Sequence, residues 1–299
     1  MEGTLLVRKL KEIGCCVCER EPLSAHTTFR IGGEATALVT AETAEQVIAV
    51  KRLCSETETP LLVIGNGSNL LVSDDGFDGV VLRLAARETV IDDCLVRAAA
   101  GSSLTKLCND VCGAGLSGLE FAFGIPGTVG GAVFMNAGAY GGQLSDVLRR
   151  VTAVTPTGDV VTMEAEELAL GYRHSVFMEN GCIVLEAELE LKTGDPCTIR
   201  AAMTDYLTRR RDKQPLEYPS AGSFFKRPEG HFAGALIEQC GLKGFTVGGA
   251  AVSEKHAGFV INLGGATCAD VLALGEAVSK TVKERFGVEL EREVQLIGG

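Results

Sequence analysis

The sequence has 299 residues, of which 46% are hydrophobic and 22% are charged; these proportions are typical of a folded globular protein and exclude extensive disorder. Its formal net charge of −11 argues against general nucleic-acid binding, which requires a basic surface to neutralise phosphates. No apolar run approaches the roughly 20 residues of a transmembrane helix. Charged residues also interrupt the first apolar stretch, so we expect a cytoplasmic protein with neither a secretory signal nor a membrane segment.

The cysteines do not form the pattern of a disulfide framework. There are 11 of them, an odd number, and most lie inside apolar segments, as expected of structural or incidental thiols. Cys15 and Cys18 have a C-x-x-C spacing, but neither a second pair nor a nearby histidine completes a zinc site. We therefore expect no metal site, and a metal or redox role for Cys15 and Cys18 remains the less favoured alternative.

The first half of the chain predicts alternating helices and strands. In chain order, the patterns predict a helix over residues 1–20, a helix that begins with a capping box at Thr43 and Gln46, a strand at 61–64, strands within 70–76 and 80–84, and a helix capped by Ser102 or Ser103 and ended by Gly113.

The second half continues the alternation. Here the patterns predict strands within 151–163 and 182–192, a basic helix within 201–218, a helix from Thr267 to Gly287 with Asp270 in its capping box, and a final strand over 288–298. The sequence therefore predicts an α+β protein. Shifts in composition divide it into residues 1–90, 91–200 and 201–299.

A short glycine-rich segment, Gly65-Asn66-Gly67-Ser68-Asn69, directly follows the strand predicted at 61–64. Glycines permit backbone conformations in which several N–H groups point at one anion, as in a phosphate nest. The segment is not a Walker loop, and Leu70 stands where a Rossmann fingerprint has its third glycine. By itself the pattern fits either a phosphate site or a tight connection between a strand and a loop.

A second glycine-rich segment extends from Gly115 to Gly142 and contains nine glycines and a single acidic residue. Loops longer than about 12–15 residues are usually functional in compact domains. The glycines allow close approach of the backbone, and Ile125 and Val129 belong to a set of apolar residues that could line a site. We interpret this segment as a site for a large, flat ligand that carries phosphates, such as a flavin dinucleotide; a purely structural loop is the alternative.

Seven segments together resemble one enzyme family. In chain order they are HTTFRIGG (26–33), the strand with GNGSNLL (61–71), GIPGTVGGAVFMNAGAYG (124–141), YRHSVF (172–177), PSAGSFFKRP (219–228), KHAGFVIN (255–262) and LEREV (290–294). This set closely resembles the UDP-N-acetylenolpyruvoylglucosamine reductases, flavoenzymes of peptidoglycan synthesis. The resemblance spans nearly the whole chain. Because no inserted loop with a substrate-binding tyrosine is present, the chain is similar to the form of the family that lacks this loop.

The resemblance implies a fold and two cofactors. It implies a flavin-binding fold of the vanillyl-alcohol oxidase type in two subdomains (1–90 and 91–200), followed by a substrate-binding domain (201–299). It further implies bound FAD, NADPH as hydride donor and UDP-N-acetylglucosamine enolpyruvate as substrate. We expect the FAD to be noncovalent, because neither glycine-rich segment contains a histidine or cysteine, and we expect a monomer.

The resemblance also implies roles for individual residues. The residues at catalytic positions are Arg173, Ser223 and Glu293. Those implied to contact FAD are Arg30, Gly65, Asn66, Gly67, Ser68, Asn69, Gly124, Ile125, Pro126, Gly127, Thr128, Gly130, Gly131, Asn136, Ala137 and Gly138. Those implied to contact the substrate are Tyr172, Lys226 and Arg227.

The residue types of the catalytic positions suit the chemistry. A guanidinium such as Arg173 binds a carboxylate through two hydrogen bonds, and Arg173 with a protonated Glu293 would stabilise negative charge that develops on the enolpyruvyl group. Ser223 would then deliver the proton. Taken singly, Arg173 fits an ordinary surface cation and Ser223 fits a turn residue. Glu293 fits a solvated strand face, which it would share with Glu289 and Glu291.

Two further features are ambiguous. The run Arg209, Arg210, Arg211 and Lys213 is either a solvated helix face or an aid to binding a diphosphate. His256 stands alone in an apolar segment, where a satisfied core or flavin-edge residue is favoured over a catalytic base.

Two other functions compete with this interpretation. A different flavin oxidoreductase of the same fold would share both glycine-rich segments but would not require Arg173, Ser223 and Glu293 together. A noncatalytic nucleotide-binding or regulatory protein would not transfer electrons at all. Reoxidation of a bound flavin by the enolpyruvyl sugar separates all three.

Overall fold

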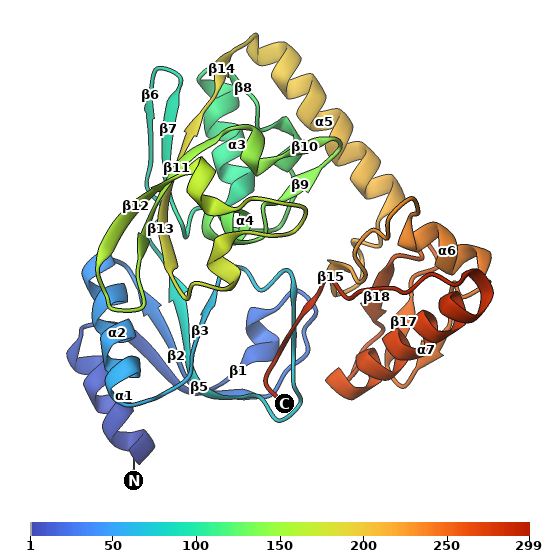
Figure 1. Ribbon diagram of the computed structural model, residues 1–299, viewed down its shortest axis with the longest axis horizontal. Helices are drawn as coiled ribbons and strands as arrows, with labels where there is room; N and C mark the ends of the chain where they lie inside the picture. Colours follow the sequence, from blue (N-terminus) through green and yellow to red (C-terminus); the bar gives the residue numbers. More distant parts are fainter. Residues whose placement is uncertain (1) are drawn as a thin grey trace. The chain divides into compact units, whose positions relative to one another are not determined.

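The computed structural model describes residues 2–299 and forms two compact units (Figure 1). Unit 1 holds the chain up to Glu19, Thr36–Asn66 and Gly79–Arg209. Unit 2 holds Arg20–Ala35, Gly67–Asp78 and Arg210–Gly299. Each unit is therefore assembled from three separate stretches of chain, and the three-part division expected from the sequence stays a prediction.

Two sheets contribute most of unit 1. The first has the order β1 (Cys16–Pro22), β2 (Glu34–Ala41), β5 (Phe77–Leu84), β3 (Leu61–Ile64), and helices α1 (Glu2–Glu12) and α2 (Ala44–Glu56) pack with it. The second is antiparallel, in the order β12 (Val160–Glu164), β11 (Leu148–Val154), β13 (Ile183–Glu190), β7 (Leu95–Ala99), β6 (Thr89–Asp92).

Helices cover one face of the antiparallel sheet and enclose a core with it. These helices are α3 (Leu104–Gly113) and α4 (Val129–Phe134), and both lie beside the sheet in Figure 1. Two-residue ladders join β8 (Leu116–Ser117) to β14 (Lys192–Thr193) and β9 (Gly138–Ala139) to β10 (Gly142–Gln143), and α5 (Pro196–Lys213) follows. Short 3₁₀ helices lie at Leu23–His26, Glu120–Ala122, Leu144–Asp146, Ala165–Leu168 and Val176–Met178.

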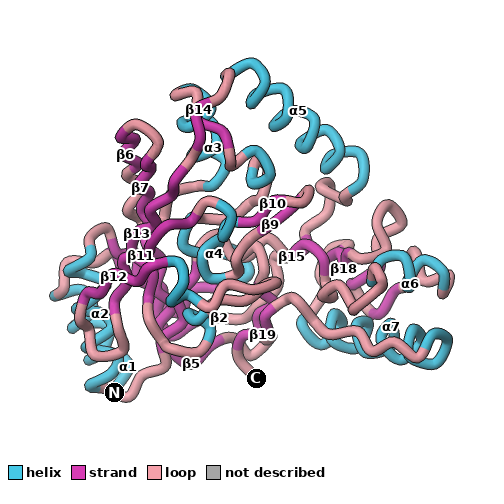
Figure 2. Tube along the Cα trace, turned by 45° about the horizontal axis from the view of Figure 1, so that its top comes forward, coloured by secondary structure: helices cyan, strands magenta, loops and turns pink. Residues whose placement is uncertain are grey.

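Unit 2 has a small antiparallel sheet covered by helices. Its order is β15 (Ser220–Ser223), β18 (Phe259–Asn262), β17 (Ala250–Val252), β16 (Thr246–Val247). Helices α6 (Ala233–Gln239) and α7 (Cys268–Phe286) lie next to this sheet (Figure 2) and form a buried core with it. A separate parallel pair joins β4 (Leu70–Val72) to β19 (Gln295–Ile297).

The predicted helix caps are confirmed. Thr43 and Gln46 form the capping box of α2, and Ser103 caps α3. Thr267 begins α7, and Gly287, at φ +69°, ends it. These positions follow from local chemistry, because a side-chain oxygen satisfies an N–H that the first turn leaves free, and glycine adopts the left-handed conformation at the end.

Several predicted boundaries are wrong. The first helix ends before Gly14, at φ +86°, and the residues that follow form β1 rather than more helix. Gly113 still belongs to α3, the basic helix begins earlier at Pro196, and the second glycine-rich segment contains α4 rather than loop alone. The last strand covers only Gln295–Ile297, because only these residues pair with β4.

Candidate active site

The two glycine-rich segments contact each other in unit 1. The side-chain amide of Asn66 donates a hydrogen bond to the carbonyl of Pro126 at 3.1 Å. A Cβ atom on Gly65 would lie 2.4 Å from Oγ1 of Thr128, so only glycine permits this approach. Residues 65–66 and 126–128, which are distant in the sequence, therefore lie side by side.

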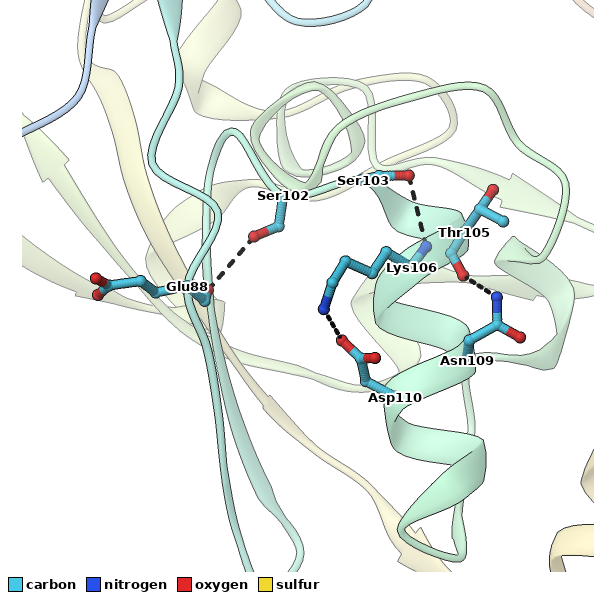
Figure 3. A network of polar contacts seen from close by, with 7 residues as sticks. All are labelled: Glu88, Ser102, Ser103, Thr105, Lys106, Asn109 and Asp110. Carbon is cyan, nitrogen blue, oxygen red and sulfur yellow. Dashed lines mark hydrogen bonds and ion pairs between the residues drawn. The ribbon is translucent and has the colours of Figure 1, made fainter.

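Polar contacts hold the start of α3 (Figure 3), and a backbone hydrogen bond joins this start to the second glycine-rich segment. The hydroxyl oxygen of Ser103 accepts a hydrogen bond from the N–H of Lys106, and the hydroxyl of Ser102 donates to the carbonyl of Glu88. The carbonyl of Ser102 accepts the N–H of Val129 at 2.9 Å. The first turn of α4 is thus held by the residues that begin α3.

Packing and backbone conformation do not explain why residues 127 and 131 are glycines. A Cβ on Gly127 would lie 3.5 Å from Leu104, and one on Gly131 would lie 3.5 Å from Thr128, both ordinary contact distances. Neither glycine has a positive φ, and Gly131 lies in a helix, where glycine costs about 1 kcal/mol relative to alanine. A ligand that approaches this backbone would account for both glycines, and their contact with FAD stays a prediction. These residues therefore fit a cofactor with a broad face and phosphates, such as FAD.

The other residues expected to contact FAD have varied surroundings. Gly130 packs closely, since a Cβ there would lie 2.9 Å from the Cβ of Ala100. Arg30, in unit 2, is exposed and has φ +56°. Contacts between FAD and Arg30, Ser68, Gly124, Ile125, Ala137 and Gly138 stay predictions.

Gly67→Val should prevent folding rather than merely weaken cofactor binding. Gly67 has φ +60°, and a Cβ there would lie 2.1 Å from the carbonyl oxygen of His26, a backbone atom that cannot move aside cheaply. The tight connection therefore requires glycine at position 67, and the contact of Gly67 with FAD stays a prediction. Gly131→Ala has room and should keep or raise the Tm of the apoprotein while weakening FAD binding. Thermal melting and FAD titration measure both effects, and native FAD affinity in Gly131→Ala would contradict a ligand at this backbone.

Arg173 lies at the tip of a tight hairpin in unit 1. Gly171 and His174 exchange backbone hydrogen bonds of 3.1 and 3.2 Å, and Tyr172 and Arg173 form the turn between them. Arg173 has φ +54°, a left-handed conformation that costs an L-residue about 1–2 kcal/mol. Its guanidinium donates to the carbonyl of Gly138 at 3.2 Å and lies 5.3 Å from the centroid of the Tyr172 ring. The strained arginine lies beside the second glycine-rich segment, and its catalytic role stays a prediction.

The side chain of Asn136 supports this hairpin. It is buried, its Nδ2 donates to the carbonyl of Gly171 at 3.0 Å, and its Oδ1 accepts the N–H of Ser145 at 2.9 Å. These bonds give Asn136 a positioning role that the sequence did not indicate, and its contact with FAD stays a prediction.

Ser223 is exposed at a β-bulge. Between Ser220 and Ser223, three steps along β15 are matched by only two along β18. Gly222 lies within the bulge at φ +81°, as in bulges built on a left-handed glycine. Ser223 is consequently exposed while the adjacent Phe224 is buried. The importance of Gly222 was missed from the sequence, although a glycine inside a strand pattern is a signal for a bulge.

In unit 2, Glu293 lies beside residues 219–228, which carry Ser223 and are called the serine segment below. The N–H of Glu293 donates to the carbonyl of Phe224 at 2.9 Å, and the N–H of Lys226 donates to the carbonyl of Glu291 at 2.8 Å. Glu293 is half-buried, whereas Glu289 and Glu291 are exposed. The three acids expected on one strand face therefore differ, and only the one implied to be catalytic is partly removed from water.

The cations near the serine segment differ in their partners. Lys226 is ion-paired with Glu291, and Arg227 is exposed. Arg209 forms an ion pair with Asp205 at 2.7 Å, which favours the solvated-helix interpretation for that part of the basic run. Binding of substrate by Tyr172, Lys226 and Arg227 stays a prediction.

His256 has the surroundings of a satisfied core residue. Its Nδ1 accepts the N–H of Gly258 at 3.1 Å, and its ring lies edge-on to Phe259 with centroids 5.0 Å apart. Burial is the main cause that lowers the pKa of His256 below its ordinary value. An Nδ1 that accepts a hydrogen bond requires the neutral ring, which fits the satisfied residue expected here; whether His256 also lies at the edge of the flavin stays a prediction.

The free energy of unfolding should fall as the pH drops below the ordinary histidine pKa of about 6.5. Because the pKa of His256 is lowered in the folded state, the unfolded chain binds this proton more readily, and stability is lost as the pH falls. Urea unfolding at about pH 7 and pH 5 measures the slope. His256→Asn places a side-chain oxygen near the position of Nδ1 but does not titrate, so its free energy of unfolding should change less between the two pH values. An equal change in the variant would show that other groups cause the pH dependence.

The cysteines are all free thiols. Burial raises the pKa of the Cys108 thiol to about 12 and that of the Cys54 thiol to about 11, and it raises the pKa of Cys15 as well. High pKa values make thiols poor nucleophiles. In residues 2–299 no group of three or more histidine, cysteine or acidic side chains is placed to hold a metal, and none of the helices has the length and apolarity to cross a membrane.

Within each unit, some of the predicted site residues lie close together. Unit 1 joins the backbone at 65–66 to the segment 126–131 and places the Arg173 hairpin against Gly138. Unit 2 places Glu293 beside the segment that carries Ser223. The roles assigned to these residues stay predictions.

Two protein-family models match the chain. Residues 35–164 match an FAD binding domain, and residues 214–297 match the C-terminal domain of UDP-N-acetylenolpyruvoylglucosamine reductase. The predicted α+β fold with an FAD-binding domain is confirmed by these matches and by the helices and strands described above.

Proteins of the same name are similar over nearly the whole chain. A UDP-N-acetylenolpyruvoylglucosamine reductase from Clostridium perfringens (strain SM101) is 50% identical over 279 residues, which cover 93% of this chain and 91% of that protein. One from Clostridium botulinum (strain Eklund 17B) is 46% identical over 94% of this chain and 92% of its own. The crystal structure of the reductase from Thermus caldophilus is 39% identical and has a TM-score of 0.81, covering 95% of this chain and 99% of that one.

Proposed function

Since the chain belongs to the UDP-N-acetylenolpyruvoylglucosamine reductase family and is an FAD-dependent oxidoreductase, we propose that it reduces UDP-N-acetylglucosamine enolpyruvate to UDP-N-acetylmuramate in peptidoglycan precursor synthesis. We propose NADPH as the hydride donor and noncovalently bound FAD as the carrier. A role in cell shape and division would follow from this reaction. The monomeric state and the cytoplasmic location stay predictions.

One observation carries the choice between this reaction and those of other flavoenzymes. In unit 2, the backbone of Glu293 is hydrogen-bonded to that of Phe224, the residue after Ser223. An exposed hydroxyl and a half-buried carboxyl group on adjacent chain segments suit the delivery of a proton to a carbon atom. An enzyme that oxidises an alcohol requires a base but no such donor.

The segments at 65–69 and 124–138 would hold the cofactor. When bound and reduced by NADPH, FAD would supply the hydride that reduces the enolpyruvyl double bond. The backbone at Gly127 and Gly131 has room for a close approach, and the contacts of Gly65 with Thr128 and of Asn66 with Pro126 fix both segments before any ligand arrives. A preorganised site of this kind does not have to order its loops on binding.

Arg173 would bind the carboxylate of the enolpyruvyl group. Its guanidinium is always charged and presents a planar set of donors that matches a carboxylate. The left-handed backbone and the hydrogen bond to Gly138 hold the side chain in place, so little reorganisation is needed when charge develops on the substrate.

Ser223 would donate the proton that completes the lactyl ether, and Glu293 would orient or stabilise the group that receives it. A serine hydroxyl is a weak acid and can protonate only a strongly basic acceptor. A carbon atom with carbanion character, conjugated to a carboxylate, meets this condition.

The visible spectrum tests the proposal. The purified chain should be yellow, release FAD on acid denaturation, lose its visible absorbance under anaerobic NADPH, and regain it with the enolpyruvyl sugar. A different flavin oxidoreductase would bind FAD but would not be reoxidised by this sugar. A noncatalytic nucleotide-binding protein would show no reduction. Failure of the sugar to reoxidise the flavin contradicts the proposed substrate, and failure of NADPH to reduce it contradicts the proposed hydride donor. Flavin that remains attached to the denatured chain contradicts noncovalent binding.

A further inference from the structure

Asn69 joins the first glycine-rich segment to the chain around Glu293. Its Nδ2 donates a hydrogen bond to the carbonyl of Glu293 at 3.2 Å, and its own carbonyl accepts the N–H of Gln295 at 3.0 Å. The parallel ladder between β4 and β19 begins at the next residue, Leu70, which pairs with Gln295. Asn69 is therefore half-buried at the start of this ladder, and all these groups belong to unit 2.

The two backbone polar groups of Glu293 are both bonded, to different parts of the chain. Its N–H donates to the carbonyl of Phe224 on the serine segment at 2.9 Å. Its carbonyl accepts from the side chain of Asn69 at 3.2 Å. A peptide held from both sides has few orientations, and so the direction of its side chain is restricted as well.

Asn66 provides a matched comparison within the same segment. Its Nδ2 also donates to a backbone carbonyl, but to that of Pro126 in unit 1, at 3.1 Å. The two asparagines make the same kind of bond at similar distances, one to a residue implied to contact FAD and the other to a residue implied to be catalytic. Their removal should therefore affect different steps.

We propose that Asn69 is a positioning residue for Glu293, and that its side-chain amide serves proton delivery in place of the FAD contact that the resemblance implies for this residue. This inference rests on the proposed function of Ser223 and Glu293. The two neighbouring asparagines then have different roles. Asn66 holds the second glycine-rich segment, and Asn69 positions the carboxyl group of Glu293.

The test compares Asn69→Leu with Asn66→Leu, because leucine is similar in shape to asparagine and has no hydrogen-bond donor. We expect Asn69→Leu to bind FAD and to be reduced by NADPH at close to the native rate, while reoxidation by the enolpyruvyl sugar slows by about 10- to 100-fold. Its kcat should fall with little change in the KM for this sugar. Asn66→Leu should instead weaken FAD binding and keep the native ratio of the two rates once saturated with FAD.

A second variant and three other outcomes test the role of Asn69. Asn69→Gln retains the amide donor and should recover part of the lost reoxidation rate. If Asn69→Leu loses FAD, or slows both half-reactions equally, Asn69 has a general structural role and the inference is wrong; native rates in both half-reactions would also overturn it. If the unaltered protein is not reoxidised by the enolpyruvyl sugar, it is the proposed function that fails.

Discussion

Ser223→Ala is expected to slow reoxidation by the enolpyruvyl substrate by about 10²-fold or more, while reduction by NADPH proceeds at close to the native rate. The two half-reactions differ because only the second requires a proton on carbon. The substitution removes a single exposed hydroxyl from the bulge at the end of β15, so the fold should be unaffected. Stopped-flow absorbance follows both half-reactions in one sample.

Two variants sharpen this test. Ser223→Cys retains an ionisable group of similar reach and should recover part of the loss. Ser220→Ala removes a hydroxyl at the other end of the same strand and should reoxidise at the native rate. If Ser223→Ala also reoxidises at the native rate, the proton comes from elsewhere, and water held by Glu293 is the next donor to examine.

Arg173→Lys should lower turnover by about 10²- to 10³-fold, with a smaller effect on the binding of substrate. Lysine keeps the positive charge but cannot reproduce the two parallel hydrogen bonds of a guanidinium to a carboxylate. A contribution made chiefly in the transition state appears in kcat rather than in KM. Steady-state kinetics with varied enolpyruvyl sugar separates the two parameters.

Two control variants test whether the effect at Arg173 is a general loss of positive charge or a change in backbone strain. Arg87→Ala removes an exposed arginine of unit 1 and should not change turnover. Arg173→Gly should be as inactive as Arg173→Lys or more so, yet its Tm should not fall, because glycine adopts φ +54° without strain. A turnover in Arg173→Lys close to that of the parent would show that charge alone suffices.

The carboxyl group is tested in the same assay. Glu293→Gln keeps a hydrogen-bond donor and should retain more activity than Glu293→Ala. Glu289→Ala is the suitable control, because Glu289 is exposed and lies 3.5 Å from its ion-pair partner Lys283, whereas Glu291 pairs with the predicted substrate residue Lys226. Equal losses at 289 and 293 would show that the segment needs its charge rather than a particular carboxyl group.

Sequence patterns predicted those parts of the fold that depend on neighbouring residues. The helix limits at Thr43 and Gly287 follow from capping and left-handed glycine, both of which act within a single turn. The end of the first helix was misplaced because residues 16–20 belong to β1, which pairs with β2, the next strand along the chain. The extent of the last strand was likewise set by β4, a partner that no local pattern reveals.

The candidate site was predicted from segment resemblance more than from local chemistry. Arg173, taken alone, resembled any surface arginine, and its left-handed backbone is visible only in three dimensions. The distinction between Glu293 and Glu291 depends on burial, which strict alternation along a strand cannot supply. The role of Asn136 depends on a bonding partner 35 residues away, so patterns of residue types did not indicate it. Gly222, by contrast, carried a local signal for a bulge that was overlooked.

The pairing of β4 with β19 also bears on how the protein matures. Leu70–Val72 is synthesised early, whereas its partner Gln295–Ile297 follows only after most of the chain has left the ribosome. Contacts between such distant segments carry a large loop-closure entropy and form late during folding. Until they form, the carbonyl of Glu293 lacks the bond from Asn69, and β4 lacks this partner strand. The bond from Asn69 to Glu293 therefore forms only after residues 295–297 have been synthesised, and every stretch of unit 1 precedes these residues in the chain.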